Sequence, residues 1–470
     1  MIKFGTGGFR AVIGDDFTKQ NVEYVAQGLV NMMKDQGVEN DPIAIGYDRR
    51  FLSELSSKWM AGVLAANGVK VHFINVDVPT PVVMYTVKQN GSHYGIAITA
   101  SHNPAEYNGI KVFTLGGRDA AREVTDELES YIEKLTPADV NTIPFEKGLA
   151  DGTIEYISPM NDYIDSILSF IDQGVIRNSH LRVLLDPMFG VSQSSLQTVL
   201  MTCRCSVDVM HGEHNPLFGG RLPAPSAKGL AHLSQKVVEG GYDLGIATDG
   251  DADRIGLIDS EGNYIHPNDI LVLLYYYLVK YKGWKGDCVR SIATTHLLDR
   301  LAADFGCTSH EVPVGFKWVS SKMDETGAII GGESSGGLTV KGHISGKDGV
   351  YAAALLVEMI CAIGKPLNEI LKEIKDTYGH CEMSEFDTRF SFEKKDELNH
   401  TLFVEKKLPD FGIEIDKVSY DDGCKVYFKN GGWIICRFSG TEPLIRIFCE
   451  QETYERAVEI TGIMRKFLGL

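Results

Sequence analysis

The chain has 470 residues, of which 44% are hydrophobic and 23% are charged, and its formal net charge is −17. This length is typical of three or four domains, and this composition is typical of a globular protein rather than a disordered or fibrous one. The negative charge argues against a general nucleic-acid-binding or membrane-surface function, because a polyanionic partner would be repelled.

The predicted elements begin with a helix, in which apolar residues recur at helical spacing from Val22 through Leu29 to Met33. Apolar, β-branched runs then predict strands at residues 43–48, 69–76, 94–100, 181–186 and 242–249. The run at residues 349–364 predicts a buried helix. Strands that alternate with helix-period segments are typical of βαβ units, so we expect an α/β fold with parallel or mixed sheets.

Glycines and polar residues cluster near residues 146–158, 259–267 and 375–385, and these clusters indicate domain boundaries. We therefore expect four domains, at residues 1–152, 153–259, 260–376 and 377–470. Each has an ordinary domain length.

The cysteines and the apolar runs indicate a cellular compartment. Nine cysteines without a C-x-x-C pair are typical of free thiols in a reducing environment. The N-terminal stretch carries no apolar leader segment, and the longest apolar run, residues 270–279, is too short to span a bilayer. We expect a cytoplasmic protein.

A serine loop follows the predicted strand 94–100, in the stretch TASHNP at residues 99–104. The end of a strand in an open α/β sheet is where ligands bind, and Asn103-Pro104 prevents a helix from starting there. Ser101 is therefore presented to a ligand, and His102 and Lys111 are able to handle protons or anionic charge. The alternative is that Ser101 and Asn103 only make a turn.

An acidic loop, TDGDADR at residues 248–254, places Asp249, Asp251 and Asp253 at every second position of a segment expected to be extended. Three carboxylates can converge on one hard cation, and Mg²⁺ is favoured because positions remain for water and a phosphate oxygen. An EF-hand would need glycine where Arg254 stands and glutamate where Ser260 stands. A solvated acidic turn remains the other alternative.

A glycine-rich loop, GGESSGG at residues 331–337, formally contains the G-x-S-x-G pattern of serine hydrolases around Ser334. That nucleophile needs a strand, a turn and then a helix, whereas the following LTVKG is β-branched. We therefore expect Glu333 and Ser335 to contact the hydroxyls of a small polar ligand instead.

A basic loop, CRFSGTEPLIRIFCE at residues 436–450, collects hydrogen-bond donors with Glu442 as the one nearby acid. The donors are Arg437, Ser439, the backbone around Gly440, Thr441 and Arg446. Such a set is typical of a cradle for a dianion. Structural arginines at strand ends are the alternative. No P-loop occurs, and GTGGFR at residues 5–10 lacks the last glycine of a dinucleotide fingerprint.

With GTGGFR, the motifs TASHNP, DGDADR, GESSGG and SGTEPLIR resemble, in order and approximate spacing, those of the α-D-phosphohexomutases, the phosphoglucomutase and phosphomannomutase superfamily. The resemblance spans essentially the whole chain. It implies a heart-shaped protein with three related α/β domains and a smaller C-terminal α+β domain around a central cleft. The four expected domains would then carry the phosphoserine, the metal, the sugar and the distal phosphate in turn.

The resemblance also implies a role for each candidate residue. Ser101 would be the phosphoserine and, with Asp249, Asp251 and Asp253, would bind Mg²⁺. Matching positions assign proton transfer or phosphate contact to His102 and Lys111, and a place facing the phosphoserine to Arg10 and Arg254. Substrate contacts would come from Lys317, Glu333, Ser335, His343, Lys347, Arg437, Ser439, Gly440, Thr441 and Arg446.

The implied reaction moves phosphate between the 1- and 6-positions of a hexose, glucose in the first place, with glucose 1,6-bisphosphate as intermediate and activator. Ser334 and Gly337 stand where some relatives have glutamate and histidine, so glucose, mannose and aminosugars stay open. Two other functions remain as alternatives, a sugar-phosphate phosphatase and a non-catalytic sugar-phosphate sensor. We expect a small-molecule hexose phosphate as the partner, no nucleic acid or membrane, and a monomer or homodimer.

Overall fold

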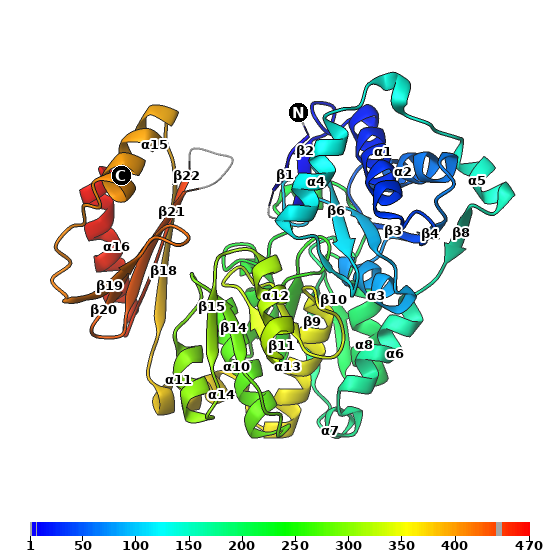
Figure 1. Ribbon diagram of the computed structural model, residues 1–470. Coiled ribbons are helices and arrows are strands. Elements are labelled where there is room, and N and C mark those ends of the chain that lie inside the picture. The colour runs from blue at the N-terminus through cyan, green and yellow to red at the C-terminus, as the bar shows by residue number, and fades with distance from the viewer. Residues whose placement is uncertain (1, 6, 439–443) are drawn as a thin grey trace.

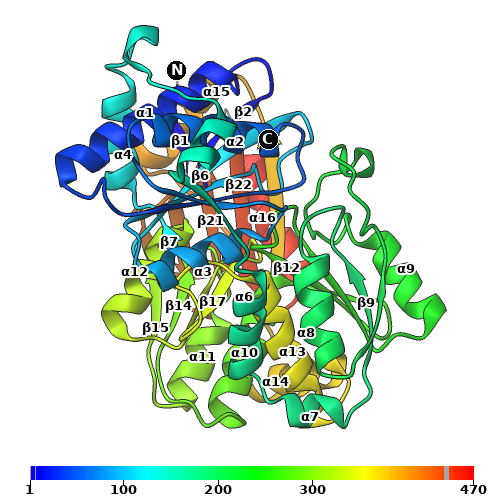
Figure 2. The same ribbon diagram turned by 90° about the vertical axis from the view of Figure 1, so that its right-hand side faces the viewer.

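The computed structural model describes residues 2–5, 7–438 and 444–470. The chain forms four sheets in sequence order, the first three mixed and covered by helices and the last antiparallel. The predicted four-domain architecture, with three α/β domains and a C-terminal α+β domain, is confirmed. In Figure 1 domain 4 stands to the left of the other three, and Figure 2 shows domain 2 beside domain 3 beneath domain 1.

Domain 1 contains an eight-stranded sheet in the order β1-β2-β6-β5-β3-β4-β8, with β7 paired to β6. Its strands are β1 Phe4–Gly5, β2 Gly8–Val12, β3 Ile43–Tyr47, β4 Val71–Ile74, β5 Tyr94–Ile98, β6 Tyr107–Thr114, β7 Arg118–Asp119 and β8 Ile154–Ile157. Its helices are α1 Lys19–Gln36, α2 Ser53–Ala66, α3 Thr80–Asn90, α4 Arg122–Ile132 and α5 Phe145–Asp151. The Thr18 side chain caps α1 by accepting from Asn21 N, and Gly37 ends it with φ of 69°.

Domain 2 contains a five-stranded sheet in the order β10-β9-β11-β12-β13. Its strands are β9 Arg182–Asp186, β10 Ser206–Val209, β11 Leu244–Thr248, β12 Ile255–Asp259 and β13 Tyr264–Ile265. Its helices are α6 Met160–Phe170, α7 Gln173–Arg177, α8 Thr198–Thr202 and α9 Ala231–Gly240.

Domain 3 contains a four-stranded sheet in the order β15-β14-β16-β17. Its strands are β14 Cys288–Ser291, β15 Ser309–Val312, β16 Ile330–Gly332 and β17 Leu338–Val340. Its helices are α10 Pro267–Lys280, α11 Leu297–Asp304, α12 Phe316–Thr326, α13 Gly349–Ile363 and α14 Leu367–Tyr378. The predicted buried helix is α13, whose apolar residues belong to the largest hydrophobic core.

Domain 4 contains the antiparallel sheet β18-β22-β21-β20-β19. Its strands are β18 Glu382–Arg389, β19 Ile415–Ser419, β20 Cys424–Phe428, β21 Trp433–Phe438 and β22 Leu444–Gln451, and its helices are α15 Phe392–Asn399 and α16 Tyr454–Leu468. Elsewhere, 3₁₀ helices lie at Pro137–Asp139 and Phe218–Gly220, and π-helical turns at Gln193–Gln197 and His400–Val404.

The first three sheets share one local design that places the predicted loops. In each, the parallel strand at one border of the parallel part of the sheet, β5, β11 or β16, is followed in the chain by an antiparallel neighbour, β6, β12 or β17. The serine, acidic and glycine-rich loops are the connections inside these three pairs. All three loops therefore leave their sheets at the carboxyl end of a parallel strand, where α/β proteins bind ligands.

The sheets extend past two predicted boundaries. Strand β8 pairs with β4 of the first sheet, beyond residue 152, because Ile154 completes the core of domain 1. Strand β13 pairs with β12 of the second sheet, beyond residue 259, so the polar turn before it is a hairpin rather than a linker. Local clusters of polar residues mark hairpins as well as domain ends.

Membrane-spanning potential is limited to one pair of helices. Within the described ranges, no single helix is both long and apolar enough to cross a bilayer; α13 and α14 meet the criteria only together, with a bend of 81°. The nine cysteines are free.

Domain 4 docks on domain 3 through a small apolar cluster centred on Trp433, with Ile292, Ala293 and Ile435. The indole is fully buried, and its Nε1 donates to Glu450 Oε1 at 2.9 Å. Beside it, Lys425 Nζ donates to Ile292 O at 2.6 Å, across the two domains. This interface fixes the position of domain 4.

Replacing Trp433 by alanine is expected to destabilise the protein by about 3–5 kcal/mol, because it leaves a cavity and removes one of the two hydrogen bonds that Glu450 Oε1 accepts, the other coming from His296 N. Thermal unfolding measures this as a lowered Tm. Trp318→Ala is the matched control, since that indole is 41% exposed, and its effect should stay within about 0.5 kcal/mol. Equal Tm values for the two variants would contradict the assigned packing.

Candidate active site

Ser101 lies in the connection between β5 and β6, with φ of 52° in the left-handed region. Its backbone N donates to Thr99 Oγ1 at 2.8 Å, and its Oγ donates to Asp249 Oδ2 of domain 2 at 2.7 Å. The side chain was predicted to be displayed at a sheet edge, but it is fully buried, because the acidic loop of domain 2 covers it. The hydroxyl thus faces a carboxylate across a domain interface.

Arg50, directly after β3, holds the serine loop from behind. Its guanidinium donates to four backbone carbonyls of this loop and of β6, those of Ser101, Asn103, Pro104 and Tyr107. The side chain is buried and lies 3.4 Å from Asp48. A loop with all these carbonyls satisfied keeps the strained backbone at Ser101 in one conformation.

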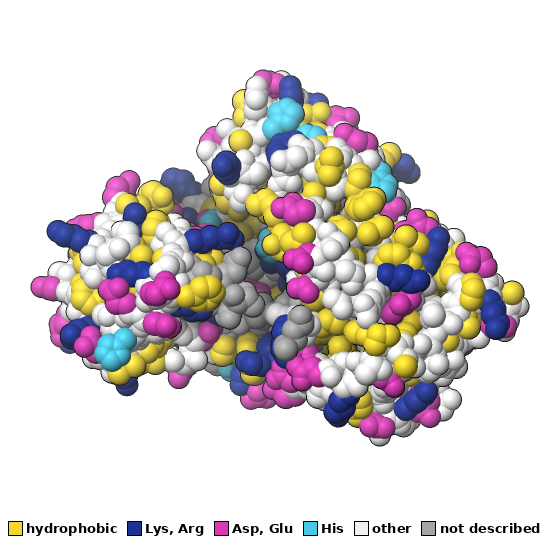
Figure 3. All heavy atoms as spheres, turned by 90° about the horizontal axis from the view of Figure 1, so that it is seen from above, with side chains coloured by type: hydrophobic (Ala, Val, Ile, Leu, Met, Phe, Trp, Pro, Cys, Tyr) yellow, Lys and Arg dark blue, Asp and Glu magenta, His cyan; other side chains and the backbone are white. Residues whose placement is uncertain are grey.

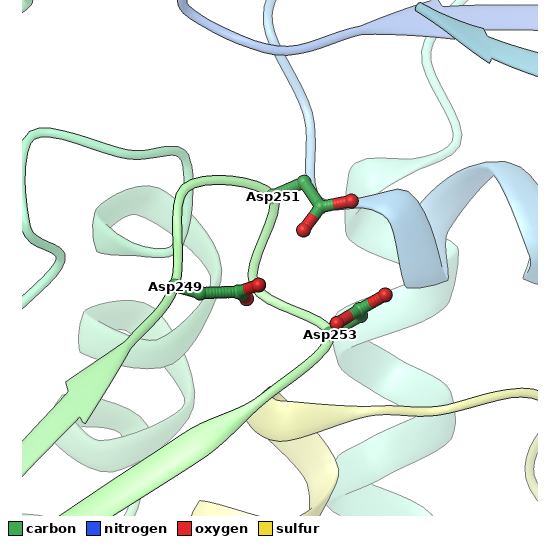
Figure 4. Close-up of side chains that lie close together, drawn as sticks. All are labelled: Asp249, Asp251 and Asp253. Atoms are coloured by element: carbon green, nitrogen blue, oxygen red, sulfur yellow. The ribbon is translucent and has the colours of Figure 1, made fainter. Parts of the chain in front are cut away.

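The acidic loop is a turn and not an extended segment, which corrects the sequence interpretation. Ala252 has φ of 61°, and its N donates to Asp249 O at 3.1 Å. The turn still brings Asp249, Asp251 and Asp253 together, with one carboxylate oxygen of each within 4.8 Å of the others (Figure 4). Gly250 permits this approach, because a Cβ there would lie 2.7 Å from Ser101 O.

Two lysines from other domains neutralise part of this acidic cluster. Lys111 Nζ, on β6, lies 2.6 Å from both Asp251 Oδ2 and Asp253 Oδ2, and Lys347 Nζ lies 2.7 Å from Asp253 Oδ2. Burial would lower the pKa of Lys111, but the two aspartates raise it, so the ammonium stays charged. Domains 1, 2 and 3 therefore meet at one set of ion pairs.

The acidic cluster fits a divalent cation. Asp251 Oδ1 and Asp253 Oδ1 are buried and accept no hydrogen bond from the described residues. Burial, and then repulsion by Asp251 and Asp253, raises the pKa of Asp249. Unpaired buried carboxylate oxygens are costly without a cation, and oxygens are the ligands that Mg²⁺ and Ca²⁺ prefer.

His102, Arg10 and Arg254 lie around the same hydroxyl. His102 Nδ1 is 3.4 Å from Ser101 Oγ, and Arg254, then burial and Arg10, hold the pKa of His102 well below its usual range. Arg10 Nη1 donates to Asn103 Oδ1 at 2.8 Å. Arg254 N donates to Asp249 Oδ1 at 3.1 Å. A neutral imidazole thus borders Ser101, and two arginines lie close enough to this imidazole to lower its pKa.

The glycine-rich loop connects β16 to the antiparallel β17, so no helix follows Ser334 and the hydrolase alternative fails. Glu333 Oε1 accepts from Gly315 N at 2.8 Å, and burial raises the pKa of this carboxyl. Ser335 is exposed. Two residues later, Gly337 forms an isolated antiparallel β-bridge with Arg254 of the acidic loop. Lys317 is the second residue of α12, and its Nζ lies 5.3 Å from the centre of the Trp318 ring.

His343 was expected to face the substrate, and this prediction is wrong. Its ring is buried and its nitrogens lie 3.0 Å from Ser166 Oγ and 3.2 Å from Asp348 Oδ2. It packs against aromatic rings of three domains, namely Tyr85, Tyr163, Phe170 and Tyr351. An imidazole buried in such packing anchors the loop that carries Lys347 and has no open edge for a ligand.

In domain 4, Arg437 on β21 and Arg446 on β22 are direct cross-strand partners. Arg437 Nη2 donates to Asp422 Oδ1 at 2.9 Å, and Arg446 Nε lies 3.5 Å from Asp387 Oδ2. Like charges directly opposite each other destabilise a sheet unless an anion joins them. The predicted contacts Ser439, Gly440 and Thr441 lie outside the described residues. Figure 3 shows the molecule hollowed between domain 4 and the other domains.

Comparison with known proteins identifies the family. Residues 1–139, 161–262 and 266–378 match the models of the three α/β/α domains of phosphoglucomutase/phosphomannomutase, and residues 402–466 match that of its C-terminal domain. The chain is 30% identical to a phosphoglucomutase/phosphomannomutase of Thermococcus kodakarensis, over 99% of this chain and 98% of the relative. The chain belongs to the α-D-phosphohexomutases.

This phosphohexomutase is thus an isomerase that acts on sugar phosphates, and its relatives differ in the sugar they are named for. It is 29% identical to a phosphoglucosamine/phosphogalactosamine mutase of Sulfurisphaera tokodaii, over 99% of this chain and 98% of the relative. Its fold is similar to the crystal structure of a phosphoglucomutase/phosphomannomutase family protein from Burkholderia thailandensis, with a TM-score of 0.82, 23% identity and coverage of 100% and 98%.

Sequence reasoning missed several residues of the phosphohexomutase site. Thr80, at the start of α3, donates through Oγ1 to Asp251 Oδ2 at 2.8 Å and through its N to Asp251 O at 2.9 Å. Asp119 on β7 carries a buried Oδ2 without a hydrogen-bond partner among the described residues, and burial raises the pKa of this carboxyl although Lys347 and Lys111 act in the opposite direction. Arg50 was detectable, because it follows the end of a predicted strand as Ser101 does. Thr80 and Asp119 do not directly follow a predicted strand, so the sequence gives no indication of their place in the site.

Proposed function

We propose that this phosphohexomutase converts glucose 1-phosphate into glucose 6-phosphate through a phosphoserine at Ser101 and a bisphosphorylated sugar. The observation that carries the proposal is the 2.7 Å contact between Ser101 Oγ and Asp249, inside a cluster of three carboxylates and two lysines. A hydroxyl beside so many fixed charges is suited to phosphoryl transfer, which depends on positioning and charge neutralisation.

Asp249, Asp251 and Asp253 would hold Mg²⁺ together with the phosphoserine. When bound, Mg²⁺ supplies positive charge to the phosphoryl oxygens. Lys111 and Lys347 already lie within 2.7 Å of the carboxylates, so they are placed to balance the charge that the phosphate adds.

In the first half-reaction the bond between phosphorus and Ser101 Oγ breaks, and a bond forms between phosphorus and a hydroxyl oxygen of the sugar. The proton of that hydroxyl passes to a base in the cleft, and an acid in the cleft delivers a proton to Ser101 Oγ, which ends as a hydroxyl. The bisphosphate then turns over, and its other phosphate returns to Ser101. Arg437 and Arg446 would hold whichever phosphate is not reacting. Burial of Ser101 would exclude water from the phosphoserine.

The name of the Thermococcus kodakarensis relative supports glucose and, as the first alternative, mannose, while the name of the Sulfurisphaera tokodaii relative supports an aminosugar as a further candidate. We propose further that the enzyme acts in the cytoplasm with glucose 1,6-bisphosphate as activator.

Coupled assays with Mg²⁺ and a trace of the sugar bisphosphate test the assignment on glucose, mannose and glucosamine 1-phosphates. We expect kcat/KM for glucose 1-phosphate to exceed the other two by about tenfold, since one sugar substituent differs. A comparable or higher kcat/KM for another sugar reassigns the substrate. Release of inorganic phosphate as fast as isomerisation would instead identify a phosphatase.

A further inference from the structure

Asp422, in the turn before β20, contacts two domains at once. Its Oδ1 accepts from Arg437 Nη2 at 2.9 Å within domain 4. Its Oδ2 accepts from Val314 N of domain 3 at 2.7 Å. Both oxygens of one carboxylate are thus used, one on the arginine assigned to phosphate and one on the neighbouring domain.

The contact with domain 3 leads directly to the glycine-rich loop. The residue after Val314 is Gly315, whose N donates to Glu333 Oε1 at 2.8 Å. Gly315 has φ of 128°, a conformation that other residues rarely adopt, so consecutive amides at 314 and 315 serve two different carboxylates. Arg437, Asp422 and Glu333 are therefore joined through two consecutive peptide units, those of the Val314 and Gly315 amides.

The turn that carries Asp422 is packed tightly against the arginine. Gly423 has φ of 101°, and a Cβ there would lie 2.6 Å from both Arg437 Cγ and Cys436 O. Arg437 also faces the like charge of Arg446 across the strand pair, so without a carboxylate its guanidinium would be driven away from that position. The turn fixes both the place of Arg437 and its direction.

We propose that Asp422 is a positioning residue that couples the phosphate-binding arginine of domain 4 to the sugar-binding carboxylate of domain 3. The proposal rests on the roles proposed above for Arg437 and Glu333. Asp422 can accept from Arg437 and Val314 together only when domain 4 is docked on domain 3. Binding of the distal phosphate and binding of the sugar hydroxyls therefore assist each other.

The test is Asp422→Asn. An amide NH₂ then replaces one of the two carboxylate oxygens and faces a donor, either Arg437 Nη2 or Val314 N, so one of the two hydrogen bonds is lost. We expect KM for glucose 1-phosphate and Kd for glucose 6-phosphate, measured by calorimetry, to rise about tenfold, with kcat changed less than about threefold. Asp421→Asn is the matched control, because the neighbouring Asp421 accepts from Ser419 Oγ at 2.7 Å on the surface. Asp422→Glu keeps both acceptor oxygens and should recover part of the affinity. Equal Kd values for Asp422→Asn and wild type overturn the proposal.

Coupling is tested by combining Asp422→Asn with Glu333→Gln. If the two residues act together, the rise in Kd for the double variant is smaller than the product of the single rises. If the rise in Kd for the double variant equals the product of the single rises, the two residues act independently and the coupling is overturned. If Asp422→Asn lowers the Tm without changing the Kd, Asp422 is a structural residue and the coupling is likewise overturned. The calorimetric measurement of Kd needs no turnover. A wrong mutase assignment would therefore be seen separately, as a wild-type protein that binds glucose 6-phosphate but does not convert glucose 1-phosphate.

Discussion

Replacing Ser101 by alanine is expected to lower the turnover of hexose phosphate by about 10⁴-fold or more, as loss of a covalent nucleophile does. The fold should be unaffected, because Ser101 Oγ contributes only its hydrogen bond to Asp249 and a longer contact of 3.4 Å with His102 Nδ1. The coupled assay measures turnover, and mass spectrometry of the protein incubated with glucose 1,6-bisphosphate measures the phosphate on Ser101. Both signals should disappear together.

Ser130→Ala is the matched control, since Ser130 lies on α4 and its hydroxyl donates to Glu127 O at the surface. This variant should keep wild-type turnover and the phosphate label. A Ser101→Ala protein that still turns over the sugar, or that is still labelled elsewhere, would remove Ser101 from the reaction. Unchanged Tm values ensure that a loss of activity reports chemistry and not unfolding.

The sequence predicts the elements well where apolar periodicity is strong. The strands at 43–47, 94–98 and 244–248 and the buried helix α13 lie inside their predicted ranges, because each depends on a continuous run of core residues. The domain boundaries are predicted less well, because a polar turn such as residues 260–263 precedes a strand of the same sheet rather than a new domain.

The site was predictable where a residue follows the end of a strand, as Ser101, Asp249 and Glu333 do. It was not predictable where the partner comes from another domain. Lys111 and Lys347 were expected at a phosphate or at the substrate, whereas their ion pairs with the acidic loop come from two different domains and are revealed only by the packing of three domains. His343 illustrates the reverse case, in which a residue beside a functional loop is turned into the core by aromatic neighbours.

Replacing Asp249 by asparagine is expected to change stability in opposite directions with and without metal. In EDTA the wild type carries three buried carboxylates, of which Asp251 and Asp253 are paired with lysines. The Asp249 carboxyl has a pKa raised by burial and by these two neighbours. The folded state therefore binds more protons than the unfolded state above the ordinary aspartate pKa of about 3.9, and stability falls as the pH rises from there. The asparagine side chain of the variant carries no such charge, so the metal-free variant should have the higher Tm, increasingly so from pH 5 to pH 8.

With saturating Mg²⁺ the order should reverse. A cation at 100 times its Kd stabilises the folded protein by about 2.7 kcal/mol, and the variant, which lacks one ligand, should lose most of that gain. Its kcat should fall by about 10²–10³-fold, as when one charge-stabilising group is removed.

Asp208→Asn is a suitable control, because Asp208 accepts from Tyr242 on the exposed surface of domain 2. A variant that is less stable than the wild type in EDTA at pH 8 would mean that Asp249 is held by its contacts with Ser101 and Arg254 rather than strained by its neighbours. If the Tm of the wild type does not change with Mg²⁺, the three aspartates do not bind this cation.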